Sequence, residues 1–259
     1  MRILFIGDIV AKVGRETVKV LLPFIINEHK IDFVIANGEN ATHGKGLSRR
    51  HYKDLIDCGI DVITLGNHFD DRQEIRDYID KVDALVRPYN LIESYPGKGS
   101  IVVTKNGVKI RITNLLLESF MKRPVQSPYA STAMLLNTIE PGIHIIDVHG
   151  EATAEKMALA YAFDGKVTAM LGTHTHVQTR DYQVFENGTA YISDVGMTGP
   201  KNGIIGVEKN SVIQKMWFNH DVHYDYDNKD EGLLSAVVLD VDETTYKAKD
   251  IYPLYLTKR

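Results

Sequence analysis

The chain has 259 residues, enough for a substantial buried core, and we expect residues 1–259 to form one large α/β domain. Apolar residues make up 44% and charged residues 25%, as in an ordinary water-soluble globular protein. The net charge of −4 argues against an extensive nucleic-acid-binding surface, although it leaves room for a local basic patch.

The first strand prediction covers residues 2–7, an apolar run too short for the core of a signal peptide. No later stretch approaches the roughly 20 apolar residues that span a membrane. The single cysteine, Cys58, rules out a disulfide within the chain and fits a reducing compartment. We therefore expect a soluble, cytoplasmic protein without a membrane partner, in which Cys58 is a buried structural thiol.

Short apolar runs end repeatedly in glycine-rich or polar loops along the chain. Continuous apolar runs of this length are typical of strands that are buried on both faces. The runs that predict such strands are residues 2–7, 33–36, 62–65, 143–148, 167–171 and 191–193.

Amphipathic helix patterns alternate with these runs. Residues 18–26 form one pattern, but Pro23 is expected to kink this helix or to split it at Leu22. Strand–helix alternation argues for an α/β core. Further helical faces are predicted in residues 52–59, 75–82 and 154–162, the last with Ala154, Met157, Ala158, Tyr161 and Ala162 on the core side.

The rest of the chain is predicted to be rich in strands. Residues 100–117 have the pattern of a β-hairpin that turns at Asn106-Gly107. Residues 211–218, 234–241 and 246–255 predict C-terminal strands, and the polar stretch 219–231 predicts an exposed, mobile loop. A pair of stacked β-sheets flanked by helices accommodates all of these elements.

Six side chains of metal-ligand type directly follow predicted buried strands. Ligands of open α/β sheets bind beyond the carboxyl ends of the strands, so these side chains are expected to share one edge. Any one of them alone would be weak evidence, whereas the set strongly indicates a metal site. The six are Asp8, Glu39, Asn67, His149, His174 and His176.

Each of these residues also has a purely structural interpretation. Asp8 is suited to cap the next helix, Glu39 and Asn40 to form a turn, and His149 to be a core histidine. The pair His174-x-His176 is harder to explain in that way, because on an extended loop both imidazoles face one side. Asn67 offers a neutral oxygen ligand, and the adjacent His68 can move protons.

The other histidines lack this context. His29, His51 and His144 are expected to be surface or structural residues, and His220 and His223 follow no buried strand. His43 lies in the glycine-rich stretch 42–46, which either borders the pocket or is a flexible connection.

With these residues in view, nearly the whole chain resembles the calcineurin-like metallophosphoesterases, and most closely their YmdB-like branch of bacterial 2′,3′-cyclic-nucleotide phosphodiesterases. Val10 stands where most of the superfamily has a histidine, and Glu39 stands where it has an aspartate. Both departures are typical of the YmdB-like branch. The matching segments are Ile6-Gly7-Asp8-Ile9-Val10, Ala36-Asn37-Gly38-Glu39-Asn40, Leu65-Gly66-Asn67-His68, His149-Gly150-Glu151-Ala152-Thr153, residues 172–179 and residues 194–200.

The resemblance implies a four-layer sandwich of two mixed sheets flanked by helices, and a site with two metal ions. One ion would be held by Asp8, Glu39, Asn40 and His176, and the other by Glu39, Asn67, His149 and His174. Glu39 would bridge them, and His68 would be the proton donor. The resemblance favours iron, while the mixed ligand set also suits manganese or zinc.

Under this interpretation a metal-activated hydroxide opens a cyclic phosphodiester and His68 protonates the departing ribose oxygen. Glu151 is expected to orient a ligating imidazole or, alternatively, to stabilise a helix N-terminus. Residues 194–200 are expected either to shape the pocket floor or to form a tight turn.

Three rival functions remain at this stage. The same centre would suit a phosphomonoester or a different phosphodiester, and a metal-containing regulatory protein with slight turnover is a further alternative. A Rossmann-type nucleotide binder is weakest, because Gly7-Asp8-Ile9 follows the first strand where Gly-x-Gly-x-x-Gly would be needed. The resemblance also suggests a homo-oligomer.

Overall fold

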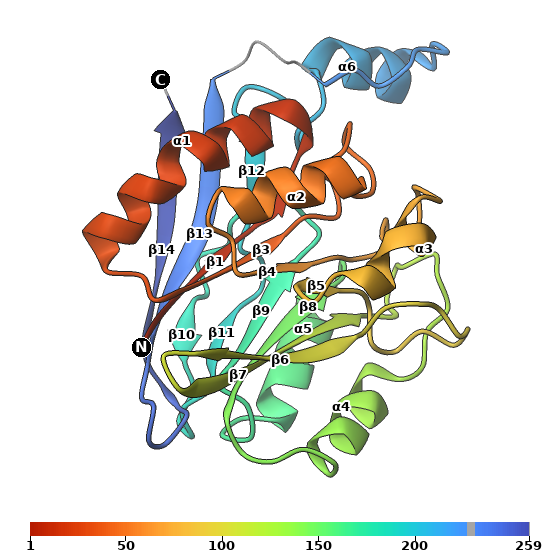
Figure 1. Ribbon diagram of the computed structural model, residues 1–259. Coiled ribbons are helices and arrows are strands. Elements are labelled where there is room, and N and C mark those ends of the chain that lie inside the picture. Colours follow the sequence, from red (N-terminus) through yellow and green to blue (C-terminus); the bar gives the residue numbers. More distant parts are fainter. Residues whose placement is uncertain (227–230, 259) are drawn as a thin grey trace.

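A computed structural model describes residues 1–226 and 231–258 of the chain. Two mixed β-sheets stack face to face, with helices on their outer faces (Figure 1). Within the described residues the first sheet has eight strands, in the order β2-β12-β13-β1-β3-β4-β5 with β14 beside β13. The second has six, in the order β10-β11-β9-β8-β7-β6. The predicted fold class is therefore confirmed.

The first sheet is built around strands that run parallel to one another. β1, β3, β4 and β5 pair in parallel. On the other side β13 pairs antiparallel with β1, and β14 pairs antiparallel with β13. The strands of this sheet are β1 (Arg2–Ile6), β2 (Asp8–Ile9), β3 (Phe33–Asn37), β4 (Val62–Thr64), β5 (Leu85–Val86), β12 (Met197–Pro200), β13 (Gly232–Val241) and β14 (Ala248–Lys258).

The second sheet also has a parallel centre, formed by β7, β8, β9 and β11. At one edge β6 and β7 form the predicted hairpin, and its turn residues Asn106 and Gly107 both have the positive φ that a two-residue hairpin turn needs. The strands are β6 (Ser100–Lys105), β7 (Val108–Leu116), β8 (Ile143–His149), β9 (Ala169–Thr173), β10 (Gln183–Val184) and β11 (Ala190–Ile192).

Three apolar layers hold the sandwich together. The middle layer lies between the sheets, where Phe5 and Ile35 of the first sheet pack with Ile112 and Ile145 of the second. Because alternate strand residues face opposite sides, the neighbouring residues pack against helices instead. The helices are α1 (Ala11–His29), α2 (Arg49–Asp57), α3 (Ile75–Tyr78) with the 3₁₀ turn η1 (Ile79–Lys81), α4 (Pro128–Leu136), α5 (Thr153–Ala162) and α6 (Lys209–Phe218).

Helix α1 overturns the split that was expected at Leu22. It runs unbroken through Pro23 and starts well before residue 18. Pro23 and Lys19, whose carbonyl loses its intrahelical donor at this proline, are both exposed. Water can therefore satisfy that carbonyl, and the buried face with Val18, Leu22 and Ile25 keeps the helix in place.

Helix α6 contradicts the strand predicted at residues 211–218. The Glu208 side chain accepts hydrogen bonds from the backbone N–H groups of Asn210 and Ser211, which caps a helix start. Asn219 ends the helix in the left-handed conformation. Among the residues of this helix only Val212 is buried. The helix stands at the margin of the sandwich (Figure 1).

Helix α5 exists where it was predicted, but its buried face is a different one. Lys156, Leu159 and Ala160 are buried, whereas Ala154 and Tyr161 of the predicted face are exposed. Alanines mark a helix face only weakly, and a lysine such as Lys156 is rarely fully buried. Its burial depends on an acidic partner from a distant part of the chain.

Three smaller predictions also need comment. Cys58 is only half-buried, because it lies at the end of α2, and its partial burial raises the pKa of the thiol. Residues 194–200 include strand β12, which pairs with β2 and β13, so they are not merely a tight turn. Of the predicted loop 219–231, residues 219–226 form no helix or strand, and residues 227–230 lie outside the described residues.

Among the described residues no helix combines the length and the apolar character that crossing a membrane requires.

Candidate metal centre and substrate cavity

The candidate ligands lie where parallel strands of both sheets end. Asp8 follows β1, Glu39 follows β3, and Asn67 follows β4 in the first sheet, whereas His149 is the last residue of β8 in the second. The loop after β9 brings His174 and His176, both with positive φ. The two sheets therefore deliver side chains from opposite sides to one place, as the sequence pattern predicted.

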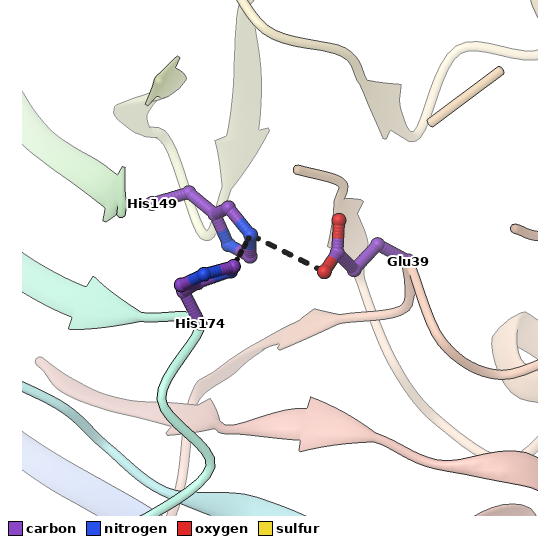
Figure 2. Close-up of side chains that lie close together, drawn as sticks. All are labelled: Glu39, His149 and His174. Carbon is purple, nitrogen blue, oxygen red and sulfur yellow. Dashed lines mark hydrogen bonds and ion pairs between the residues drawn. The ribbon is translucent and has the colours of Figure 1, made fainter. Parts of the chain in front are cut away.

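One group of donors surrounds the ring of His149. Its Nε2 atom lies 2.9 Å from Asn67 Oδ1, 3.2 Å from Glu39 Oε1 and 3.2 Å from His174 Nδ1. Figure 2 shows the Glu39 carboxylate and the two imidazoles directed at one another. One donor atom each from Glu39, His149 and His174 lies within 4.8 Å of the others, an arrangement that can hold a cation.

A second group of donors also includes a contact with Glu39. Asn40 Nδ2 is 3.1 Å from Glu39 Oε1 and 3.2 Å from His176 Nε2, which is itself 3.8 Å from Asp8 Oδ1. Glu39 thus contacts members of both groups. Asp8 Oδ1 is buried and has no hydrogen-bond partner among the described residues, and an ionised oxygen in that position needs a cation.

The charges in the centre perturb one another strongly. Burial works against ionisation of Glu39, but the imidazole of His149 and the N–H of His68 outweigh it and hold the pKa of Glu39 below its usual range. Burial also opposes the charge on His149, yet Glu39 and Asp8 raise the pKa of His149 to about 9. Burial raises the pKa of Asp8 to about 7. For His174, burial and the neighbouring charge of His149 lower the pKa to about 3.

A cavity of about 760 Å³ opens beside the centre, and Asn67, His68 and His174 are part of its wall. His68 is partly exposed there, and its Nδ1 lies 2.8 Å from Asp71 Oδ2. With a proton on Nδ1 directed at this carboxylate, Nε2 is left for a ligand. Glu151 Oε2 lies 3.4 Å from His174 Nε2, a contact that one of the two expectations for Glu151 requires.

Comparison with known proteins identifies the family. A family model described as "YmdB-like protein" matches residues 4–254. The chain belongs to the YmdB-like family.

This YmdB-like chain is similar to a named enzyme and to a solved structure over nearly its whole length. It is 45% identical over 254 residues to the 2′,3′-cyclic-nucleotide 2′-phosphodiesterase of Bacillus subtilis. The aligned region covers 97% of this chain and 95% of the relative. A phosphatase structure from Mycoplasma pneumoniae superimposes with a TM-score of 0.94 and 36% identity, over 99% of this chain and 93% of the other.

A more distant structure shares the fold of the YmdB-like chain. A putative 5′-nucleotidase from Staphylococcus aureus superimposes with a TM-score of 0.59 at 14% identity, over 98% of this chain and 54% of the other. The two mixed sheets flanked by helices therefore occur in nucleotidases as well as in the YmdB-like family.

A layer of buried polar residues lies beneath the centre, and sequence reasoning missed it. Asp147 accepts hydrogen bonds from Asn37 Nδ2 at 3.0 Å, Thr64 Oγ1 at 2.5 Å and Thr173 Oγ1 at 2.6 Å. Because the Thr173 hydroxyl donates to Asp147, it accepts from His149 Nδ1, 2.8 Å away. This fixes the ring with its Nε2 atom toward Glu39. An aspartate within the apolar run 143–148 was the available signal.

A buried ion pair anchors the loop that bears His174 and His176. Lys156 Nζ donates to Thr173 O at 2.8 Å and to Asp194 Oδ2 at 3.2 Å, and both side chains are almost fully buried. Asp194 also accepts the N–H of Thr175 at 2.8 Å. The pair therefore holds the backbone on each side of His174. The sequence pattern included Asp194 only as part of the segment 194–200, and it did not single out Lys156.

The purely structural interpretations of Asp8, of Glu39 and Asn40, and of His149 have different outcomes. Asp8 does not cap a helix, since α1 begins after Val10 without a side-chain cap. Glu39 and Asn40 do lie in a turn, but both are buried. The ring of His149 has a partner at each nitrogen, and one side of it faces Glu39.

The remaining histidines lie away from the centre. His29 Nδ1 contacts the Tyr252 hydroxyl and His51 Nδ1 contacts Thr42 Oγ1, while His144 is buried against Thr113. These contacts confirm structural roles. The stretch 42–46 borders the cavity through Lys45, whereas the ring of His43 packs edge-on near His51.

Proposed function

We propose that this chain hydrolyses 2′,3′-cyclic nucleotides at a centre of two metal ions. The observation that carries the proposal is the buried Asp8 Oδ1, which has no hydrogen-bond partner among the described residues and lies near two groups of donors that both contact Glu39. The B. subtilis relative, named a 2′,3′-cyclic-nucleotide 2′-phosphodiesterase, supports the choice of substrate.

The donor set fits two transition-metal ions. Asp8, Glu39, Asn40 and His176 would hold one ion, and Glu39, Asn67, His149 and His174 the other. The amide of Asn40 would turn over to present its oxygen, an exchange that costs only the hydrogen bonds its nitrogen now makes. Mixed carboxylate, amide and imidazole ligands suit iron, which we favour, and also manganese or zinc.

When bound, two such ions neutralise the phosphate and lower the pKa of water, so that water attacks at neutral pH. The protein supplies the proton for the departing ribose oxygen through His68. Its Nδ1–H is directed at Asp71, 2.8 Å away, which orients the ring. In-line attack opens the cyclic phosphate, and the proton passes from His68 Nε2 to the oxygen that leaves.

A paired substitution tests the separate roles of His68 and Asn67. His68→Ala is expected to keep both metal ions and to slow turnover of a 2′,3′-cyclic nucleotide by roughly 10²–10⁴-fold. The loss should be much smaller for bis(p-nitrophenyl) phosphate, because p-nitrophenolate departs without a proton. Asn67→Ala, which removes a ligand, should lower the metal content and slow both substrates alike.

Two measurements decide the matter: elemental analysis and the rates of both variants on both substrates. Equal losses on the two substrates for His68→Ala would remove His68 as the proton donor. One bound ion or none in protein purified without a chelator, after growth with ample metal, would refute the two-metal centre.

A substrate panel separates this proposal from its rivals. The M. pneumoniae structure is described as a phosphatase, so the panel includes a phosphomonoester as well as linear and cyclic diesters. Preference for the monoester would favour a phosphatase. Full metal content with negligible turnover on every substrate would favour a regulatory or binding protein.

A further inference from the structure

The cavity beside the centre has two chemically different halves. Asn67, His68 and His174 form the half next to the candidate metal ligands. The apolar part of the wall lies beyond them and comes from two segments outside the centre, residues 91–95 and 120–124: Leu91, Ile92, Tyr95, Phe120, Met121 and Pro124. A volume of about 760 Å³ exceeds what a cyclic phosphate alone needs and lies within the roughly 300–1,000 Å³ of small-molecule sites.

Phe120 is the most exposed large apolar side chain among the described residues, at 86%. Its backbone has φ +63°, a left-handed conformation that disfavours bulky side chains. A turn imposes this conformation, since the N–H of Met121 donates to the carbonyl of Glu118. Glu155 of α5 fixes the turn by accepting the N–H groups of Glu118 and Ser119 at 3.0 and 2.9 Å.

Packing gives no reason for an aromatic ring at this position. The ring is neither buried nor in contact with another aromatic ring among the described residues, and glycine would fit the turn better. An anchored turn thus holds a free aromatic face at the rim of the cavity. Aromatic side chains in such positions stack on nucleobases, and any base can use them because each has a π-face.

The charges around the rim fit a nucleotide as well. Lys45 and Lys122 line the cavity, and within residues 1–226 and 231–258 neither ammonium group makes an ion pair or a hydrogen bond. Arg123, by contrast, is engaged, with Nη2 2.7 Å from Asp70 Oδ1 and its guanidinium over the ring of Phe69. The two free cations can attract an anionic ligand, and Glu93 is the acidic group on the apolar side.

We propose that the apolar half of the cavity is a nucleobase subsite in which the base of the substrate stacks on Phe120, with Ile92 contributing to the apolar wall. This inference rests on the proposed function and adds how the non-reacting part of the substrate is recognised. Purines should bind more tightly than pyrimidines, because they offer a larger surface for stacking.

The test compares a cyclic nucleotide with a substrate that lacks only the base. For Phe120→Ala, the KM for a purine 2′,3′-cyclic nucleotide should rise about 5- to 100-fold. The KM for ribose 2′,3′-cyclic phosphate should rise less than twofold, and the purine preference should largely disappear. Phe120→Trp should restore the KM for the nucleotide, since it keeps an aromatic face.

Phe24→Ala is the matched control, because Phe24 is an exposed phenylalanine of α1 that does not line the cavity. It should change neither KM. Phe120→Ala should also unfold at the temperature of the wild type or above it, because the ring is exposed and alanine fits the turn no worse. Lower stability, with equal changes of KM on both substrates, would overturn the subsite in favour of a structural role.

Failure of this inference can be told apart from failure of the proposed function. Turnover of both substrates with no effect of Phe120→Ala would overturn the subsite alone. No turnover of either substrate by the wild type would overturn the proposed function. The affinities of the wild type and of Phe120→Ala for a purine nucleoside monophosphate would then test the subsite independently of turnover.

The base that occupies the subsite can come from a mononucleotide or from the end of an oligoribonucleotide with a terminal cyclic phosphate. Comparing the kcat/KM values of these two substrates identifies which source the site prefers.

Discussion

Replacement of Lys156 by methionine should destabilise the protein and loosen the metal centre together. The substitution keeps an apolar chain of similar length but removes the ammonium group. Asp194 then loses its cation while remaining buried, although it still accepts the N–H groups of Thr175 and Gly196, each at 2.8 Å. The carbonyl of Thr173 loses its 2.8 Å donor and keeps only a longer contact of 3.4 Å with the N–H of Gly150.

The magnitude follows from the burial of the pair. Removing one partner of a buried ion pair costs about 3–5 kcal/mol. Because two backbone donors still stabilise Asp194, we expect the lower end, about 3 kcal/mol. For a chain of this size that corresponds to a fall in Tm of roughly 6–12 °C. Adding Asp194→Asn removes the stranded charge, so the double variant should recover part of the loss, by about 0.5–3 kcal/mol.

Urea unfolding in the presence of a chelator measures the free energy of unfolding without a contribution from bound metal. Elemental analysis of protein purified without chelator then measures the metal content, which should fall if the loop with His174 and His176 is displaced. Lys12→Met is the control, since Lys12 forms a surface pair with Glu16 at 3.6 Å and should cost less than about 1 kcal/mol. A Lys156→Met variant as stable as Lys12→Met, with full metal content, would refute the anchoring role.

Three further predictions follow from the same structure. Glu39→Ala should empty both metal positions in elemental analysis, and retention of two tightly bound ions would disprove the bridge. Gly66→Ala should lower the metal content, because a Cβ atom there would lie 2.4 Å from Glu39 Oε2 and 2.5 Å from His149 Nε2, whereas Gly142→Ala, with its nearest atom 3.6 Å away, should be silent. Burial lowers the pKa of His144 to about 3, so the folded protein keeps this ring neutral while the unfolded chain binds a proton below about pH 6.5. Stability should therefore fall as the pH drops from about 6.5 toward 3, by up to about 1.4 kcal/mol per pH unit for this group, and His144→Gln should flatten that slope in urea titrations at pH 6 and pH 4.

The sequence by itself determined the strands of the core and the edge at which the candidate site lies. A strand buried on both faces is a continuous apolar run, and the polar residue that ends it is visible locally. Asp8, Glu39, Asn67 and His174 were found in this way, and the structure brings them together. The hairpin turn at Asn106-Gly107 was also predicted correctly, because its positive φ angles depend on residue type alone.

Local patterns failed where an element is stabilised by its capping residues or by partners distant in the sequence. Helix α6 was mistaken for a strand, because its apolar residues suggested burial whereas the helix is mostly exposed and capped by Glu208. The interruption expected at Pro23 did not occur, because the proline lies on the exposed side of α1 and the opposite face is packed against the first sheet.

Tertiary structure alone decided the polar residues that support the site. Lys156 and Asp194 are 38 residues apart, and Asn37 and Asp147 are 110 residues apart. Such residues are normally exposed, and each is stable inside the protein only because another strand or helix supplies an opposite charge or a hydrogen bond. The apolar half of the cavity likewise forms only when residues 91–95 and 120–124 meet beside the metal centre. Burial of charge and the shape of a cavity depend on which segments meet, and that is fixed only when the two sheets stack.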